Sequence, residues 1–169
     1  MDSLLYKILL LLHLASVIVG FGSAFVPPML RARARRLPPG DAYAINHAAF
    51  GITGPLSVYP TIAAGVFGIL LIVTSDEVWK FSQTWVSIAF LLWLLVLAVA
   101  FLLHLPNLKA MDEAGRRLAE GQLTESRTGG EPKEVVELKE RESKAASFSG
   151  MMHLLWLLLM IDMIWKPGL

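Results

Sequence analysis

The stretch TWVSIAFLLWLLVLAVAFLLHL, residues 84–105, decides the fold. It is an apolar run without a charged side chain, and its length is close to the roughly 20 residues that a helix needs to cross about 30 Å of hydrocarbon. Three more apolar runs of similar length lie at residues 4–26, 56–74 and 148–165. The sequence therefore predicts an all-α integral membrane protein: a four-helix bundle that forms a single domain over residues 1–169.

The composition supports a membrane protein. Hydrophobic residues make up 55% of the chain and charged residues 17%, whereas a soluble domain has about 45–50% and about 25%. The net charge of +1 gives no indication of nucleic-acid binding, so the expected partner is the lipid bilayer. Because the chain has no cysteine, disulfides, iron–sulfur clusters and thiolate zinc sites are excluded. Motifs of soluble enzymes, such as HExxH or a phosphate-binding glycine loop, do not occur.

Basic residues predict the orientation. The loop after the first run contains RARARR (residues 31–36), and the loop at 107–146 begins with further basic residues. An excess of Lys and Arg next to a span marks the cytoplasmic side. The prediction is an inner-membrane protein with both termini outside the cytoplasm. The arginines directly after the first run also indicate a retained helix rather than a cleaved signal peptide.

The 107–146 loop is expected to form a cytoplasmic helical hairpin between the third and fourth spans. Pro132 suits the first turn of a helix, and no helix breaker occurs between there and Phe148, so the fourth helix is predicted as one long rod. The hairpin is either a solvated extension or a docking site for a partner. In the second helix, which is expected to start near Ala42, Gly51, Gly54, Pro55 and Pro60 predict a kink or a break into two pieces.

The best functional clue is that one histidine lies within or at the edge of each long apolar segment: His13, His47, His104 and His153. An ionisable group within a span is costly and often marks a ligand site or a proton path. Small residues follow some of these histidines, notably Gly20 and Gly51, and could make room for a flat ligand or for a neighbouring helix. By depth, His13 pairs with His153 near the midplane, and His47 pairs with His104 near the inner surface.

These pairs suggest a bis-histidine haem b, with the metal ligands expected at His13 and His153. Copper is a second candidate metal, because the fourth helix is rich in methionine. The alternative is that no cofactor binds and the histidines are hydrogen-bonding groups between helices. Asp162 is expected to reach water from the outer end of its helix. Tyr59, Trp79, Trp85 and Trp165 fit an interfacial aromatic belt.

The segment LLYKILLLLHLASVIVGFGSAFVPPMLRARARR resembles the first helix of a family of uncharacterised bacterial four-span membrane proteins. It is more distantly similar to CopD-type copper-resistance proteins and HemJ-type protoporphyrinogen oxidases. The resemblance implies a four-span fold and carries a functional residue over only at His13. The turn VIVGFG at residues 17–22 lacks the aromatic pair of the HemJ type.

Two hypotheses follow. The first is a redox protein that binds haem b or a metal through its histidines and acts on a lipophilic substrate such as a quinol or a porphyrinogen. The second is a non-catalytic scaffold or accessory subunit of a membrane complex, with a second copy of the chain or another subunit as its partner. The sequence does not decide whether the protein is an enzyme.

Overall fold

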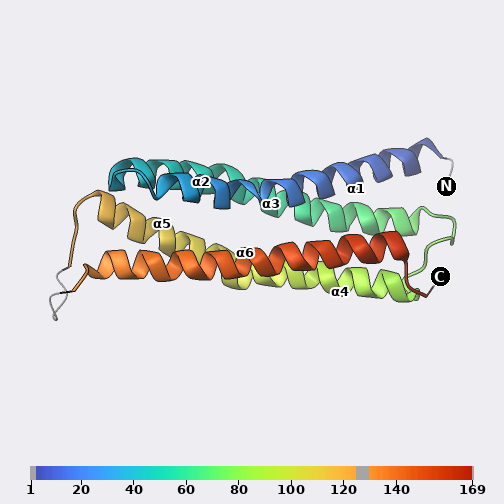
Figure 1. The fold of residues 1–169 in the computed structure, drawn as a ribbon. Coiled ribbons are helices and arrows are strands. Elements are labelled where there is room, and N and C mark those ends of the chain that lie inside the picture. The colour runs from blue at the N-terminus through green and yellow to red at the C-terminus, as the bar shows by residue number, and fades with distance from the viewer. Residues whose placement is uncertain (1–2, 125–129, 169) are drawn as a thin grey trace.

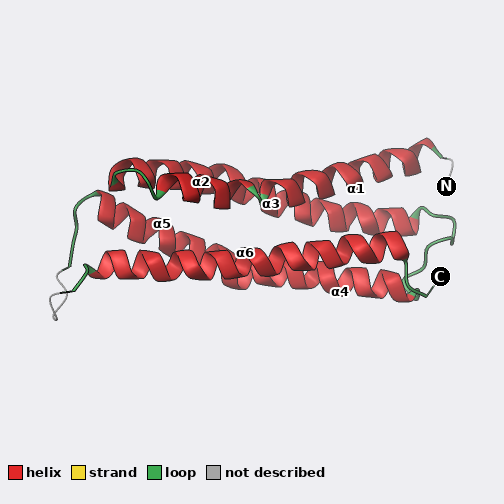
Figure 2. Cartoon of the chain, viewed as in Figure 1, coloured by secondary structure: helices red, strands yellow, loops and turns green. Residues whose placement is uncertain are grey.

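The structure is a computed structural model that describes residues 3–124 and 130–168. Over these residues all regular secondary structure is helical, and the helices lie along a common direction (Figures 1 and 2), so the all-α prediction is confirmed. In chain order the elements are α1 (Leu4–Ser23), α2 (Val26–Ala34), α3 (Pro39–Val73), α4 (Thr84–Ala98), the π-helix η1 (Val99–His104), α5 (Leu105–Ala119) and α6 (Lys133–Trp165).

These elements form four rods that alternate in direction. The first rod is α1 followed by α2, the second is α3, the third runs from α4 through η1 into α5, and the fourth is α6 (Figure 1). Within the described ranges, these four rods are long and apolar enough to cross a membrane. Both ends of the chain and the α3–α4 connection lie at one end of the bundle, and the α2–α3 and α5–α6 connections lie at the other (Figure 1).

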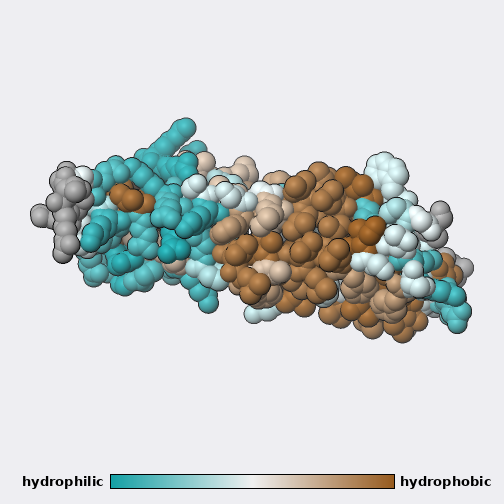
Figure 3. All heavy atoms as spheres, turned by 90° about the horizontal axis from the view of Figure 1, so that it is seen from below, coloured by the Kyte–Doolittle hydropathy of each residue, from teal (hydrophilic) through white to brown (hydrophobic). Residues whose placement is uncertain are grey.

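The rods are longer than a bilayer is thick. Helix α6 has 33 residues, which corresponds to about 50 Å at about 1.5 Å per residue, against about 30 Å of hydrocarbon. The surface is divided accordingly: one face shows a hydrophobic section toward the termini and a hydrophilic section over the α5–α6 connection (Figure 3). We call these the apolar end and the polar end. As predicted, α6 is one unbroken helix from Lys133 to Trp165.

Helix α3 also stays continuous, although Pro55 and Pro60 lie inside it. Of the two predicted alternatives, a kink or a break into two pieces, the break does not occur, and the helix begins at Pro39 rather than near Ala42. Hydroxyl side chains at every fourth position, Thr53, Ser57 and Thr61, donate to the carbonyl oxygen one turn earlier. These bonds reach the carbonyls of Ala49, Thr53 and Ser57 and not those of Gly51 and Leu56, which the two prolines leave without a helical donor. Packing against neighbouring helices allows proline within membrane helices, and α3 packs against α1 and α2.

The π-helix η1 lies directly before Pro106. Proline has no N–H to donate, and its ring meets the carbonyl four residues earlier, here that of Leu102. A wider π turn relieves this conflict and keeps the helix axis running from α4 into α5.

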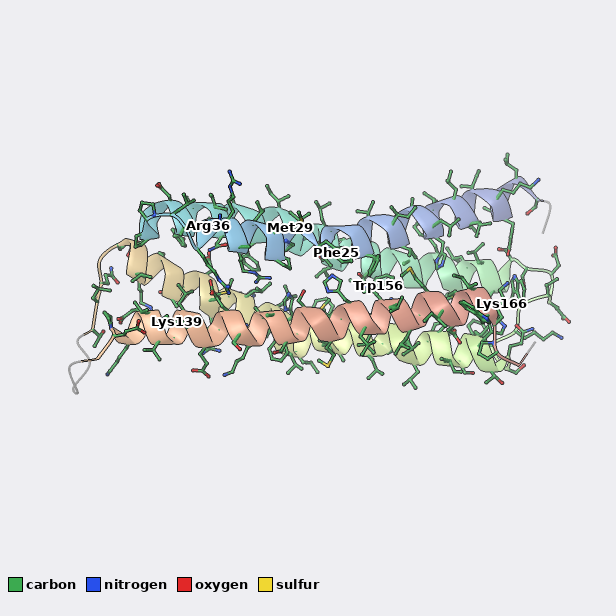
Figure 4. The ribbon with its side chains drawn as sticks, viewed as in Figure 1. Phe25, Met29, Arg36, Lys139, Trp156 and Lys166 are labelled. Atoms are coloured by element: carbon green, nitrogen blue, oxygen red, sulfur yellow. The ribbon has the colours of Figure 1, made fainter. Side chains whose placement is uncertain are left out.

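The four rods pack as two pairs. Helix α1 packs on α3, and α4 packs on α6. Near the middle of the bundle, a hydrophobic cluster joins the pairs: Val17 and Phe21 of α1 pack against a buried group that includes Val96, Met152 and Trp156. Phe25 and Trp156 lie in this region (Figure 4). Beyond the cluster, toward the termini, α1 diverges from α6 (Figure 1).

Candidate functional site

A cavity of about 360 Å³ lies at the apolar end, between the two helix pairs. All four rods contribute to its walls through α1, α3, α4 and α6, and most of the lining is aliphatic or aromatic. We call it the outer cavity. Its polar lining groups are few, and His13 and Lys166 are the main ones. An apolar hollow with a small number of placed polar groups is typical of a small-molecule site.

His13 is held on one side of this cavity by a backbone group. Its Nδ1 lies 2.8 Å from the carbonyl oxygen of Ala64 in α3. Since a carbonyl oxygen can only accept, Nδ1 carries the proton and Nε2 of the neutral ring is an acceptor or a metal ligand. The ring lies against α3 at Gly68, where a Cβ would be in van der Waals contact with His13 Cε1 at 3.4 Å.

Trp93 forms a second wall. Its indole N–H donates to the carbonyl oxygen of Thr61 at 2.9 Å, so the ring lies flat along α3. This position requires Gly65, because a Cβ at residue 65 would overlap the Trp93 ring. The space over Gly65 is thus filled by one of the protein's own side chains.

Aromatic side chains and a lysine surround the cavity where it meets the end of the bundle. The rings of Trp79 and Trp85 are in edge contact at 5.3 Å, and the Trp79 indole donates to the Tyr6 hydroxyl at 3.1 Å. Trp85 is only 7% exposed, so these two tryptophans face inward rather than forming the aromatic belt expected from the sequence. Trp165 does point outward, with 74% exposure.

His104 lines a separate, smaller pocket of about 50 Å³ toward the polar end, together with Arg31 and Ser149. Its Nδ1 is buried and has no hydrogen-bond partner in the described part of the chain. Arg31 and His153 both lie near enough to interact with His104 electrostatically. The volume is sufficient for one or two water molecules, which would satisfy such a group.

His153 does not line the outer cavity with His13. Its Nδ1 lies 2.6 Å from the carbonyl oxygen of Ser149 in its own helix, and its ring packs against Phe25 at 4.5 Å between centroids. Its Nε2 is buried without a partner among the described residues. The structure therefore places His153 near His104, and the expected pairing of His153 with His13 is not found.

His47 lies at the polar end on the surface of the bundle. Its Nδ1 is 2.9 Å from a carboxylate oxygen of Asp112, and its side chain is 59% exposed. This hydrogen bond links α3 to α5. The expected pairing of His47 with His104 is not found either, since His104 lines the smaller pocket and His47 binds a carboxylate.

The two predicted glycines differ in role. A Cβ at Gly20 would lie 3.3 Å from the Thr61 hydroxyl, so Gly20 allows α1 to approach α3 closely. Gly51 has open space around its Cα.

Residues 3–124 and 130–168 contain no group of three or more His, Cys, Asp or Glu side chains that could hold a metal ion. Binding of haem or copper stays a prediction.

Sequence reasoning missed three functional features. Asp162 is 5% exposed, and neither carboxylate oxygen has a hydrogen-bond partner in the described ranges, so it does not reach water as expected. Trp93 and Lys166 both line the outer cavity. Only the position of Trp93 in the middle of a span, away from any interface, is visible in the sequence as a signal.

No family model matches this chain, and comparisons with curated proteins and with solved structures give no match either.

Proposed function

We propose that this protein is a four-span membrane protein that binds a lipophilic small molecule in its outer cavity, with His13 as the polar anchor. The observation that carries the proposal is the combination of an apolar cavity of about 360 Å³ with one imidazole whose Nδ1 is held by a backbone carbonyl. A fixed acceptor in an apolar hollow selects a ligand that is mostly hydrocarbon but carries a hydroxyl or other donor.

The membrane is proposed to be the inner membrane, with the polar end in the cytoplasm and both termini outside. The support is that Arg31, Arg33, Arg35 and Arg36 all lie in or beside α2 at the polar end, as the charge bias of cytoplasmic segments requires. The polar part of α5 and α6 then forms the cytoplasmic hairpin. The outer cavity lies in the opposite half of the membrane.

The test is to purify the full chain in mild detergent and identify copurifying small molecules by solvent extraction and mass spectrometry. Wild-type protein should retain a lipophilic compound at a stoichiometric level. Ala89→Phe fills the cavity from α4, since Ala89 is buried and lines it, and should remove the compound. Ala15→Phe on the exposed face of α1 is the matched control and should retain it.

His13→Phe separates anchoring from filling. It keeps a ring of similar shape but removes the acceptor, and the ligand content should fall by roughly tenfold, which is about 1.4 kcal/mol and is typical of a lost buried hydrogen bond. Equal ligand content in wild type, Ala89→Phe and His13→Phe would overturn the proposal.

Haem binding for a redox role is a second candidate. It is supported by the Ala64 carbonyl that orients His13, since ligating histidines commonly donate their other N–H in this way, and by Met163, which lines the same cavity from α6. The purified protein would then show a Soret band that shifts on reduction and is absent in His13→Phe. If the wild-type protein contains neither a bound lipophile nor a chromophore, the result favours the scaffold hypothesis.

A further inference from the structure

Lys166 lies at the C-terminal end of α6 (Figure 4), where it is part of the lining of the outer cavity. Its Nζ is 4.1 Å from the ring centroid of Trp79 and 5.5 Å from that of Trp85. No carboxylate of the described residues pairs with it. Among the residues that the structure describes, the ammonium group therefore has aromatic partners only, and the faces of two indoles do not use all of its three N–H donors.

The position of Lys166 is fixed by its backbone. The residue adopts a left-handed conformation with φ of 45°, which ends α6 and turns the chain toward α4. Gly168 then packs against the first residue of α4, where a Cβ would lie 3.1 Å from the Thr84 hydroxyl. A left-handed conformation in a residue other than glycine is costly and persists only where surrounding contacts hold it. The lysine is therefore presented at the cavity by a tail that is packed in place.

We propose that the occupant of the outer cavity is a single-chain hydroxy acid, whose carboxylate binds Lys166 and whose hydrocarbon chain carries a hydroxyl that donates to Nε2 of His13. This inference rests on the function proposed above and specifies its ligand. A carboxylate suits Lys166 because a charge-assisted hydrogen bond to an ammonium in a region of low dielectric is among the stronger polar contacts available. Most of the remaining lining, including Leu10, Val17 and Leu159, offers hydrocarbon.

The size of the cavity argues for one chain. A volume of about 360 Å³ is near the lower limit of the roughly 300–1,000 Å³ usual for ligand sites, which suits one acyl chain better than two. Trp79 and Trp85 lie next to Lys166 and favour a small head group there. Both features favour a single-chain acid over an ordinary two-chain phospholipid.

Photo-crosslinking in zwitterionic nanodiscs tests this proposal. The probes are a palmitic acid analogue with a hydroxyl and a diazirine in its chain, the corresponding alcohol, and a lysophosphatidic acid with the same chain. In wild-type protein the acid should crosslink to residues of the outer cavity with the highest apparent affinity. Lys166→Gln should lower the affinity for the acid by roughly five- to tenfold and leave the affinity for the alcohol unchanged, since only the acid loses a charge partner.

Lys80→Gln is the matched control. Lys80 is an exposed lysine at the same end of the bundle, is paired with Glu77 and does not line the cavity, so its removal should change none of the affinities. Acid and alcohol binding with equal affinity in wild type, or no effect of Lys166→Gln, would overturn the carboxylate assignment while leaving the binding function intact. Tighter binding of lysophosphatidic acid would also overturn it. Failure of all three probes to reach the cavity would instead count against the binding function itself.

Discussion

Gly65 lies where the indole of Trp93 crosses α3, and the absence of a side chain there is a steric requirement. Gly65→Ala should displace the ring and break its hydrogen bond to the Thr61 carbonyl. We expect the free energy of unfolding to fall by about 1–3 kcal/mol, the usual cost of overpacking a core. Thermal unfolding in detergent measures this change. Gly150→Ala is the control: nothing lies within 4 Å of its added Cβ, so it should stabilise the helix by up to about 1 kcal/mol.

At Asp162 a substitution is expected to stabilise the protein. Its carboxylate is buried and has no hydrogen-bond partner in the described part of the chain. Replacing an unsatisfied polar group by an apolar one of similar size is commonly neutral or stabilising. Asp162→Leu should therefore raise the free energy of unfolding by about 1–3 kcal/mol. A clear drop in the unfolding temperature would show that the carboxylate makes a stabilising interaction.

At the scale of elements, η1 is a π turn that holds one residue more than an α-helix would need. Deleting Leu102, which is 73% exposed, should convert η1 to α-helix and leave α5 facing α6 as before. Leu94 is an exposed residue within α4, a regular α-helix that holds no extra residue. Its deletion should therefore rotate the helix that follows by about 100° relative to the part before it.

We therefore expect the Leu102 deletion to give a monodisperse, folded protein and the Leu94 deletion to aggregate, as judged by size-exclusion chromatography and helical circular dichroism. The same outcome for both deletions would show that η1 does not absorb an extra residue.

The start of α6 is tied to the end of α5 through a carboxylate outside the spans. The Thr124 backbone N–H, and then its hydroxyl, donate to Glu134, and these bonds hold the pKa of Glu134 below its ordinary value of 4.5. A lowered carboxyl pKa means that this stabilisation is complete above about pH 4.5 and is lost as the pH falls through the lower, folded-state pKa.

Glu134→Gln should therefore unfold at a lower temperature than wild type at pH 7, and the difference should shrink as the pH is lowered toward 3. Thermal scans across this range measure it. Glu77→Gln removes an exposed carboxylate at the opposite end and controls for the change in net charge. A difference that is independent of pH would contradict the role given to the Thr124 bonds.

For the whole molecule, the proposed orientation can be tested because the chain contains no cysteine. Single cysteines can be introduced at Lys80, in the α3–α4 connection, and at Arg36, in the α2–α3 connection, both exposed. With a membrane-impermeant maleimide, Lys80→Cys should be labelled in intact spheroplasts and Arg36→Cys only after permeabilisation. The reverse pattern would invert the orientation.

The four rods were predictable from the sequence because bilayer thickness sets a minimum length for any spanning apolar run. The arrangement around the histidines was not. His13 donates to the carbonyl of Ala64, which is 51 positions away along the chain. Because every residue has a carbonyl, no side-chain pattern in the sequence predicts this contact. Similarly, small residues such as Gly20 and Gly65 predict a close approach. They do not reveal whether a helix, an indole or a ligand approaches.

The length of the rods has a mechanical consequence. Helix α6 crosses the boundary between the hydrocarbon-facing and hydrophilic sections without a hinge, with about 20 Å on one side of the boundary and about 30 Å on the other. Because no hinge interrupts the helix, a displacement of its tip near Lys133 would be transmitted along the rod to the arm that carries Leu159, Met163 and Lys166.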